Sequence, residues 1–159
     1  MGESLRIRLE QSKGFDNAAL EAMINVMVVA CHFNECNDRI CARFGITRSQ
    51  YNVLRILRGV HPGGHPRQEI TRRMVDRSPD VTRLIDRLEA TGFVERERTD
   101  TDRRLSIARI TQKGLDLLDS MDPEFDRLTA RIGEQLNSHE LLELSRLCEA
   151  LYAVESTPA

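Results

Sequence analysis

Residues 78–98, SPDVTRLIDRLEATGFVERER, contain in one stretch the start, the buried face and the end of a helix, followed by a strand. Ser78 is a residue type that caps helix starts, and Pro79 suits the first helical position. Gly92 is typical of the residue that follows a helix. The pattern predicts a helix from Ser78 to about Thr91.

This predicted helix has an apolar and a polar face. Its apolar residues follow the spacing i, i+3, i+4 and i+7, which places them on one side of a helix: Val81, Leu84, Ile85 and Leu88. The polar residues fall on the other side: Thr82, Arg83, Asp86 and Arg87. We expect the first set to be buried and the second to face outward.

After Gly92 the spacing changes to that of strands. Residues 93–98 and 105–110 are two short β-type segments, and the polar segment 99–104 separates them. Two such segments around a polar turn predict a β-hairpin with a long, charged tip.

Helices are also predicted before this unit. Asp16 or Asn17 can cap a long helix that reaches about Arg43. Thr47 and Gln50 have the spacing of a capping box at the start of the next helix. A shorter helix can begin with Pro66 at its first position.

Two more helices are predicted after the hairpin. Thr111 can cap the first, which Pro123 should kink or interrupt. Residues 137–140 can cap the last. The expected fold is mainly α, with six helices and one small hairpin.

Charge is unevenly distributed along the 159 residues. Residues 48–113 hold 15 basic and 9 acidic side chains, a net charge of +6, whereas the remainder has a net charge of −8. Of the 23 basic residues, 21 are arginine, which makes planar, bidentate contacts to phosphate and guanine. A basic segment between acidic ones is expected when that segment faces a polyanion.

The order helix, short helix, turn, helix and hairpin over residues 47–110 is that of a winged helix-turn-helix. The third helix of such a unit fits the major groove of double-stranded DNA, and its start can hold a phosphate. The contacts predicted on this helix are Ser78, Pro79, Thr82, Arg83 and Arg87.

The hairpin tip supplies the second predicted contact. Arg103 and Arg104 lie on a protruding loop, or wing, that can reach the narrow minor groove. Asp102 is expected to support the wing by pairing with an arginine, because a carboxylate is a poor direct contact to DNA.

Four stretches together resemble the MarR family of transcription regulators. They are residues 46–54 (ITRSQYNVL), residues 78–96, the wing residues 102–104 (DRR) and residues 110–114 (ITQKG). The resemblance implies an intertwined homodimer in which Arg104 enters the minor groove. Two lobes would read a near-palindromic operator with half-sites about one DNA turn, ~34 Å, apart.

The same resemblance divides the chain into three parts within one structural domain. Residues 1–45 would form an N-terminal dimerisation helix, residues 46–112 the DNA-binding lobe, and residues 113–159 the C-terminal dimerisation helices. Members of the family are often released from DNA by small phenolic or carboxylate ligands. The residues expected near such a ligand are His32, Asn34, Tyr51 and Arg55.

The four cysteines raise a second possibility. Cys31 and Cys148 are expected to be small buried apolar residues. Cys36 and Cys41 are candidate thiol sensors, since a cysteine in the middle of a helix can be exposed at a dimer seam. The function expected is a cytoplasmic repressor released by a small ligand, and a regulator that responds to thiol oxidation is the alternative.

Other classes of function are disfavoured. No segment has the length of a membrane span, and no nucleotide-binding loop or convincing catalytic cysteine with His and acid partners is present in the sequence. His61 and His65 have no third ligand at suitable spacing, so we expect no metal and no cofactor. A helical dimer that contacts protein instead of DNA remains the alternative from another class.

Overall fold

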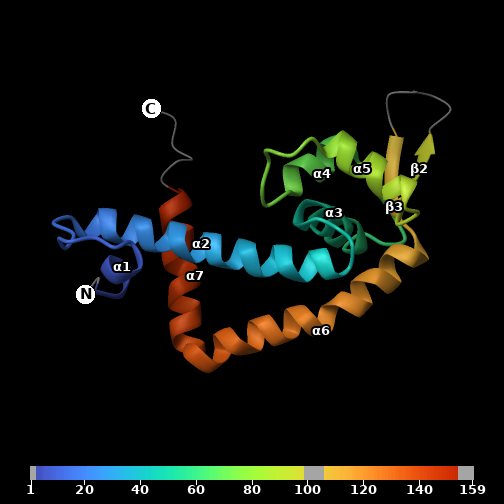
Figure 1. Ribbon diagram of the computed structural model, residues 1–159. Helices are drawn as coiled ribbons and strands as arrows, with labels where there is room; N and C mark the ends of the chain where they lie inside the picture. Colours follow the sequence, from blue (N-terminus) through green and yellow to red (C-terminus); the bar gives the residue numbers. More distant parts are fainter. Residues whose placement is uncertain (1–2, 99–105, 154–159) are drawn as a thin grey trace, which may run out of the picture.

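The computed structural model describes residues 3–98 and 106–153 (Figure 1). Its helices are α1 (Glu3–Arg8), α2 (Ala18–Arg43), α3 (Arg48–Arg58), α4 (Arg67–Arg73), α5 (Val81–Ala90), α6 (Gln112–Gln135) and α7 (Ser138–Ala153). Its strands are β1 (His65–Pro66), β2 (Val94–Arg98) and β3 (Ser106–Ile110).

The elements from α3 to β3 gather into one lobe at the end of the long helix α2, and α6 leads from this lobe to α7 (Figure 1). The core of the lobe lies between α3, α4, α5, the sheet and the first half of α6. Its fully buried side chains include Leu54, Leu57, Ile70, Leu88 and Leu118. Burying each such side chain contributes about 1.5–3 kcal/mol. The predicted buried face of α5 is confirmed.

The hairpin is part of a three-stranded antiparallel sheet with the order β1-β3-β2. Val94 pairs with Ile110 and Arg98 with Ser106, so β2 and β3 form the predicted hairpin. The two-residue strand β1 pairs His65 with Ala108, which attaches the loop before α4 to the hairpin.

Local sequence signals account for most helix starts. Asn17 caps α2, and Thr47 and Gln50 form the predicted capping box of α3, with the Thr47 Oγ1 accepting from the Gln50 N–H at 3.2 Å. Thr111 caps α6 by accepting from the Gly114 N–H, and its hydroxyl donates to the Gly92 carbonyl at 2.7 Å.

Gly114 is required by packing at this junction. A Cβ atom there would collide with the Phe93 carbonyl oxygen and the Ile110 side chain. The Thr-x-x-Gly segment therefore joins the end of the sheet to α6 through a cap at Thr111 and a close backbone contact at Gly114.

The structure differs from the sequence prediction in the number and the continuity of its elements. The described residues contain seven helices instead of six, because the short α1 forms and buries Leu5. They also contain the additional strand β1. Finally, Pro123 does not interrupt α6, which is continuous from Gln112 to Gln135. Packing of Met121 and Phe125 on the core of the lobe holds the chain helical on both sides of the proline.

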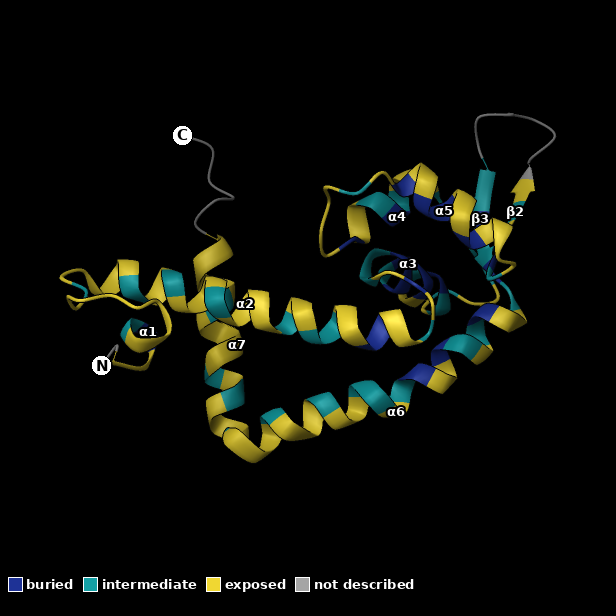
Figure 2. Cartoon of the chain, in the orientation of Figure 1, coloured by how far each residue is buried: buried dark blue, intermediate teal, exposed yellow. Residues whose placement is uncertain are grey.

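The helices outside the lobe are largely exposed (Figure 2), and several of their exposed residues are large and apolar. Met23 and Met27 on α2 are 52% and 58% exposed, and Leu142 and Leu151 on α7 are 73% and 56% exposed. No residue of α7 is buried within the single chain. Among the described residues, no helix combines the length and hydrophobicity needed to cross a membrane.

Candidate nucleic-acid interface

Helix α5 begins later than the sequence pattern predicts. Asp80 is its cap, and its Oδ1 accepts from the N–H groups of Thr82 at 3.0 Å and Arg83 at 3.3 Å. Ser78 instead donates its hydroxyl and its N–H to Asp76 Oδ1, at 2.7 and 2.9 Å. These two hydrogen bonds, the hydroxyl bond first, hold the pKa of the Asp76 carboxyl below its usual range. A carboxylate is favoured at the positive end of a helix. The predictions that Ser78 is the cap and that Pro79 is the first helical residue are therefore wrong. The N–H groups at the start of α5, which were expected to hold a phosphate, are hydrogen-bonded to the Asp80 carboxylate.

The polar face of α5 is exposed as predicted. Thr82, Arg83 and Arg87 all lie on it. Arg83 is 79% exposed at its side chain and lies 3.4 Å from the Asp80 carboxylate. Such an exposed ion pair is worth at most about 1 kcal/mol, so Arg83 can leave it to contact a ligand.

Arg96 on β2 is a site residue that the sequence analysis did not identify. Its guanidinium pairs with Asp86 on the exposed face of α5, and its Nε lies 3.4 Å from Glu89 Oε2. Arg96 is 23% exposed at its side chain. It thereby attaches the hairpin to α5 and neutralises the carboxylates of that helix.

The hairpin is held to the rest of the lobe by Arg109. Its Nη2 lies 2.6 Å from Glu97 Oε2, and its Nη1 donates to the Pro62 carbonyl at 3.0 Å. The predicted wing contacts Arg103 and Arg104, and the supporting Asp102, lie outside the described residues.

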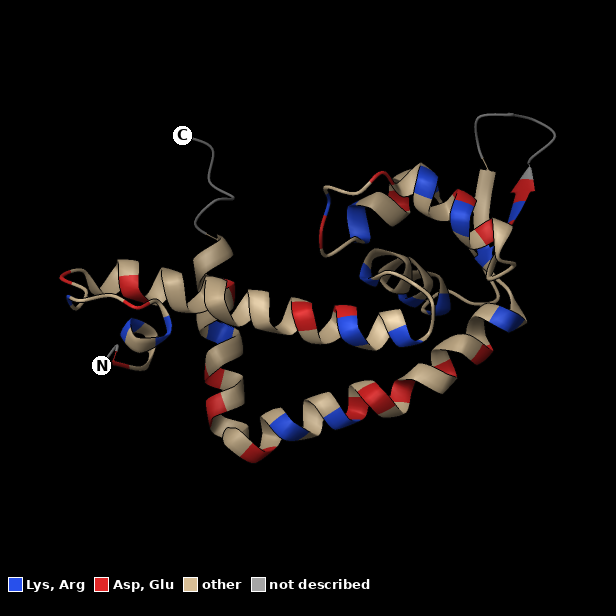
Figure 3. Ribbon diagram, in the orientation of Figure 1, with Lys and Arg blue, Asp and Glu red and all other residues tan. Residues whose placement is uncertain are grey.

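Basic residues continue from α5 onto α4 and the turn between them. Figure 3 shows basic positions of these segments on the side of the lobe that faces away from α6. A hollow of about 360 Å³ is lined by Arg67, Gln68, Thr71, Arg72 and Arg77. Sequence spacing does not predict this group, because only the folded turn brings Arg77 back to α4.

The four residues expected near a small ligand separate into two groups. Tyr51 and Arg55 lie together, since the Arg55 Nη1 donates to the Tyr51 hydroxyl at 2.9 Å. The Tyr51 ring stacks on Phe125 of α6, with centroids 4.4 Å apart and planes at 12°. His32 and Asn34 are exposed on α2, and in the described part of the chain neither is hydrogen-bonded to the first pair.

Two ion pairs hold α6 on either side of Pro123, one to α3 and one to the end of α2. Arg58 donates to Asp122 at 2.9 Å, which raises the pKa of Arg58, and Arg43 donates to Glu124 at 2.8 Å, which lowers the pKa of Glu124. The stacked rings of Tyr51 and Phe125 therefore lie at a junction whose ion pairs fix the position of α6.

The cysteines differ from expectation at three positions. Cys31 is exposed and Cys148 is half-buried, so neither is the buried apolar residue expected, because α2 and α7 lie outside the core. Cys41 is fully buried, and burial raises the pKa of its thiol to about 11, which makes it a poor thiol sensor. Cys36 is half-buried; Arg39 Nη2 donates to its Sγ at 3.1 Å and the His32 Nε2 lies 3.8 Å away.

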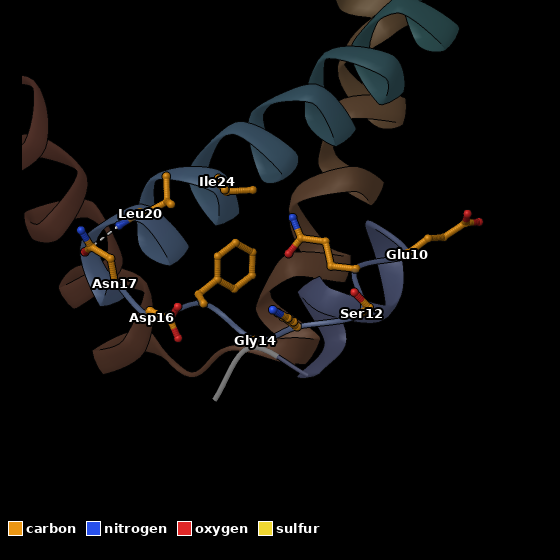
Figure 4. Close-up of a pocket in the computed structure, with 10 residues that line it drawn as sticks. Glu10, Ser12, Gly14, Asp16, Asn17, Leu20 and Ile24 are labelled. Atoms are coloured by element: carbon orange, nitrogen blue, oxygen red, sulfur yellow. Dashed lines mark hydrogen bonds between the residues drawn. The ribbon is translucent and has the colours of Figure 1, made fainter.

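A second hollow, of about 580 Å³, lies between the loop after α1 and the start of α2 (Figure 4). Its lining includes Glu10, Lys13, Asp16, Leu20 and Ile24. It is at the end of α2 far from the lobe (Figure 1). Within residues 3–98 and 106–153, no group of three or more His, Cys, Asp or Glu side chains is placed to hold a metal ion.

Known proteins are similar to this chain in both sequence and fold. Residues 44–105 match the MarR family. The HTH-type transcriptional regulator MhqR of Bacillus subtilis (strain 168) is 31% identical over 116 residues, which are 69% of this chain and 79% of MhqR.

Solved structures extend this similarity to the long helices. A MarR transcription factor from Planctomyces limnophilus is 35% identical, with a TM-score of 0.67 over 86% of this chain and 98% of that chain. Sco3205, a MarR family transcriptional regulator from Streptomyces coelicolor solved in complex with DNA, is 21% identical and has a TM-score of 0.75, covering 94% of this chain and 95% of that chain.

Proposed function

Because the chain belongs to the MarR family of DNA-binding transcriptional regulators, we propose that it is a homodimeric repressor, released from a near-palindromic operator by a small aromatic or carboxylate ligand. The observation that carries this proposal is the exposed, arginine-bearing face of α5 beside the hairpin. Side chains on such a face reach base edges when the helix lies in the major groove.

The contacts proposed to DNA are Thr82, Arg83 and Arg87 on α5, with Arg103 and Arg104 on the wing. Ser78 and Pro79 lie just before α5, where they can approach a phosphate without capping the helix. The complex between Sco3205 and DNA supports the use of this fold on a duplex.

A second copy of the chain is the partner proposed for the helices outside the lobe. Met23 and Met27 on α2 and Leu142 and Leu151 on α7 are more than half exposed in the single chain. Exposed apolar surfaces of this kind mark interfaces between proteins. Two copies would also present two lobes to the two halves of a palindrome.

The ligand is proposed to enter between α3 and α6, beside Tyr51 and Phe125. The Arg55 guanidinium can bind a carboxylate, and the stacked rings of Tyr51 and Phe125 can accept a third aromatic ring. A ligand that separates these rings would move α6 relative to the lobe and so change the spacing of the two lobes.

One observation favours a second mode of release, through oxidation of Cys36. The Arg39 Nη2 donates to its Sγ at 3.1 Å, and the His32 Nε2 lies 3.8 Å from it. A hydroperoxide would be attacked by the thiolate at its outer oxygen; the O–O bond breaks, the thiolate becomes a sulfenic acid, and the alkoxide takes up a proton and leaves as the alcohol. A Cys36→Ser variant that still loses DNA on oxidation would exclude this mode.

The proposal is tested by electrophoretic shift on duplex DNA from upstream of the gene that encodes the protein. We expect a retarded complex whose affinity falls steeply as salt rises, and a dimer by analytical ultracentrifugation. Benzoate should release the DNA from the unmodified protein and less so from an Arg55→Ala variant. A salt-independent affinity, or a monomer that binds DNA fully, would contradict the proposal.

A further inference from the structure

One of the two lysines in this arginine-rich chain, Lys113, lies where the end of α5 meets the start of α6. Its Nζ donates to the carbonyl of Thr91, the C-cap of α5, at 2.8 Å. The same ammonium group lies 5.0 Å from the centroid of the Phe93 ring, within the range of a cation–π contact. The lysine therefore places a positive charge at the negative end of α5, where a cation stabilises a helix.

The backbone that follows α5 is hydrogen-bonded to the start of α6 at successive residues. The Thr111 hydroxyl donates to the Gly92 carbonyl at 2.7 Å, and the Thr111 N–H donates to the Phe93 carbonyl at 3.1 Å. With the bond from Lys113 to Thr91, three consecutive carbonyl groups accept from the cap and the first turn of α6. We call these five residues, Thr91, Gly92, Phe93, Thr111 and Lys113, the α5–α6 joint.

The α5 side of the joint is itself fixed to the helix. Gly92 has a φ of 76°, in the left-handed region that favours glycine, and its N–H donates to the Glu89 carbonyl at 2.9 Å. The Phe93 N–H donates to the Leu88 carbonyl, also at 2.9 Å. A change in the direction of the joint therefore changes the direction of α5.

The α6 side of the joint continues without interruption out of the lobe. Helix α6 has 24 residues, which span about 36 Å, and leads to α7 (Figure 1). Arg58 of α3 holds its middle through Asp122 at 2.9 Å. The joint thus connects α5 to the helices whose exposed apolar side chains are proposed to contact a second copy.

From these contacts we propose that Lys113 is a positioning residue for DNA binding, which holds the end of α5 on α6 and so fixes how the two α5 helices of a dimer are spaced. Lys113 is exposed, and its bond to Thr91 joins two helices without contributing to the buried core. Loss of the ammonium group would free the end of α5 to pivot, so that a duplex with incorrectly spaced half-sites is penalised less. This assignment rests on the proposed function, a dimer on a near-palindromic operator.

The test compares two replacements of Lys113. Lys113→Met removes the ammonium group and keeps an unbranched side chain, whereas Lys113→Arg keeps a cationic donor. Lys13→Met is the matched control, because it removes the same charge from the loop before α2, far from the lobe. Urea unfolding and analytical ultracentrifugation check that each variant is folded and has the oligomeric state of the unmodified protein.

Fluorescence anisotropy then measures the affinity for the upstream duplex and for duplexes with a base pair added or removed between the half-sites. Lys113→Met should lose about tenfold in affinity for the natural spacing and little for the altered spacings, because the joint occurs twice in a dimer. Lys113→Arg and Lys13→Met should keep the discrimination of the unmodified protein. The slope of log K against log salt should be the same for Lys113→Met and Lys13→Met, whereas a lost phosphate contact would reduce it by about 0.9.

Three results would overturn the positioning role and leave the proposed function standing. They are an unchanged discrimination between spacings in Lys113→Met, an equal loss of affinity for every spacing, and a salt slope reduced as for a lost phosphate contact. If the unmodified protein binds every spacing equally, or binds as a monomer, the proposed dimer on a near-palindrome is wrong and the positioning role is wrong with it.

Discussion

The guanidinium of Arg96 on β2 is paired with the carboxylate of Asp86 on α5, so that a strand of the hairpin neutralises a carboxylate on the exposed face of this helix. Glu89, one turn further along α5, lies 3.4 Å from the same side chain. In the proposed complex with DNA, α5 carries two carboxylates near its arginines and needs such a counter-charge to approach a polyanion.

Replacing Arg96 should therefore weaken DNA binding more than it weakens the fold. Each uncompensated carboxylate adds repulsion on the order of 1 kcal/mol at 4 Å in water. We expect Arg96→Ala to reduce affinity about tenfold, or 1.4 kcal/mol, in an anisotropy titration. Its free energy of unfolding should fall by about 1 kcal/mol, because Arg96 is 23% exposed and its partner Asp86 is 53% exposed.

The double variant Arg96→Ala, Asp86→Asn is the control for this prediction. It removes one of the carboxylates that Arg96 neutralises and should recover part of the lost affinity. Equal affinities of Arg96→Ala and the unmodified protein would show that the pair has no part in binding.

Removal of the α5 cap should destabilise the lobe. Asp80→Ala leaves the Thr82 and Arg83 N–H groups without their acceptor, and the loss of an N-cap costs about 1 kcal/mol. Urea unfolding of Asp80→Ala and Ser78→Ala measures the difference. A larger loss in the free energy of unfolding for Ser78→Ala than for Asp80→Ala would contradict Asp80 as the cap.

The features predicted well from sequence are those whose partners are close in the chain. The capping box of Thr47 and Gln50 and the Thr111 cap involve residues three apart, and the buried face of α5 repeats every turn. The cap of α5 was missed because Ser78 and Asp80 are both good caps. The choice between them depends on Asp76, which binds Ser78, in a turn anchored by Asn52.

The site was predicted less completely than the fold for the same reason. Thr82, Arg83 and Arg87 follow from helical spacing alone. Arg96 could be recognised only after β2 was placed beside α5, and Arg77 only after its turn had folded back on α4. Whether Cys31 is exposed depends on whether another surface covers α2. The spacing of nearby apolar residues in the sequence does not predict this.

Alanine substitutions at two glycines of α6, Gly114 and Gly133, should change the free energy of unfolding in opposite directions. A methyl group at Gly114 would collide with the Phe93 carbonyl, whereas Gly133 has open space around it. Gly114→Ala should lower the free energy of unfolding by about 1–3 kcal/mol through overpacking. Gly133→Ala should raise it by up to about 1 kcal/mol, since alanine is the better helix former. Thermal unfolding checks both, and a stabilised Gly114→Ala variant would contradict the close contact.

Thiol labelling should separate Cys41 from Cys36. The pKa of Cys41 is about 11, so at pH 8 its thiolate is scarce and its Sγ is buried. Peptide mass spectrometry after iodoacetamide treatment should find Cys36 modified and Cys41 unmodified until the protein unfolds. Comparable labelling of both would refute the burial of Cys41.

The raised pKa of Cys41 also has a consequence for stability. The folded chain keeps the Cys41 proton to a higher pH than the unfolded chain. The contribution of the buried thiol to the free energy of unfolding is therefore fully present below about pH 9 and is lost as the pH rises through about 11. Urea unfolding at pH 8 and pH 10.5 should show a smaller decrease for Cys41→Ala than for the unmodified protein. An identical decrease would mean that Cys41 is not the group that titrates.

Hydroxyl-radical footprinting of the operator tests most directly whether two α5 helices of a dimer lie in successive major grooves. We predict two protected patches on one face of the duplex, about 34 Å apart, and weaker protection of both patches with Arg83→Ala. A single protected patch, or uniform protection along the duplex that Arg83→Ala leaves unchanged, would contradict the account.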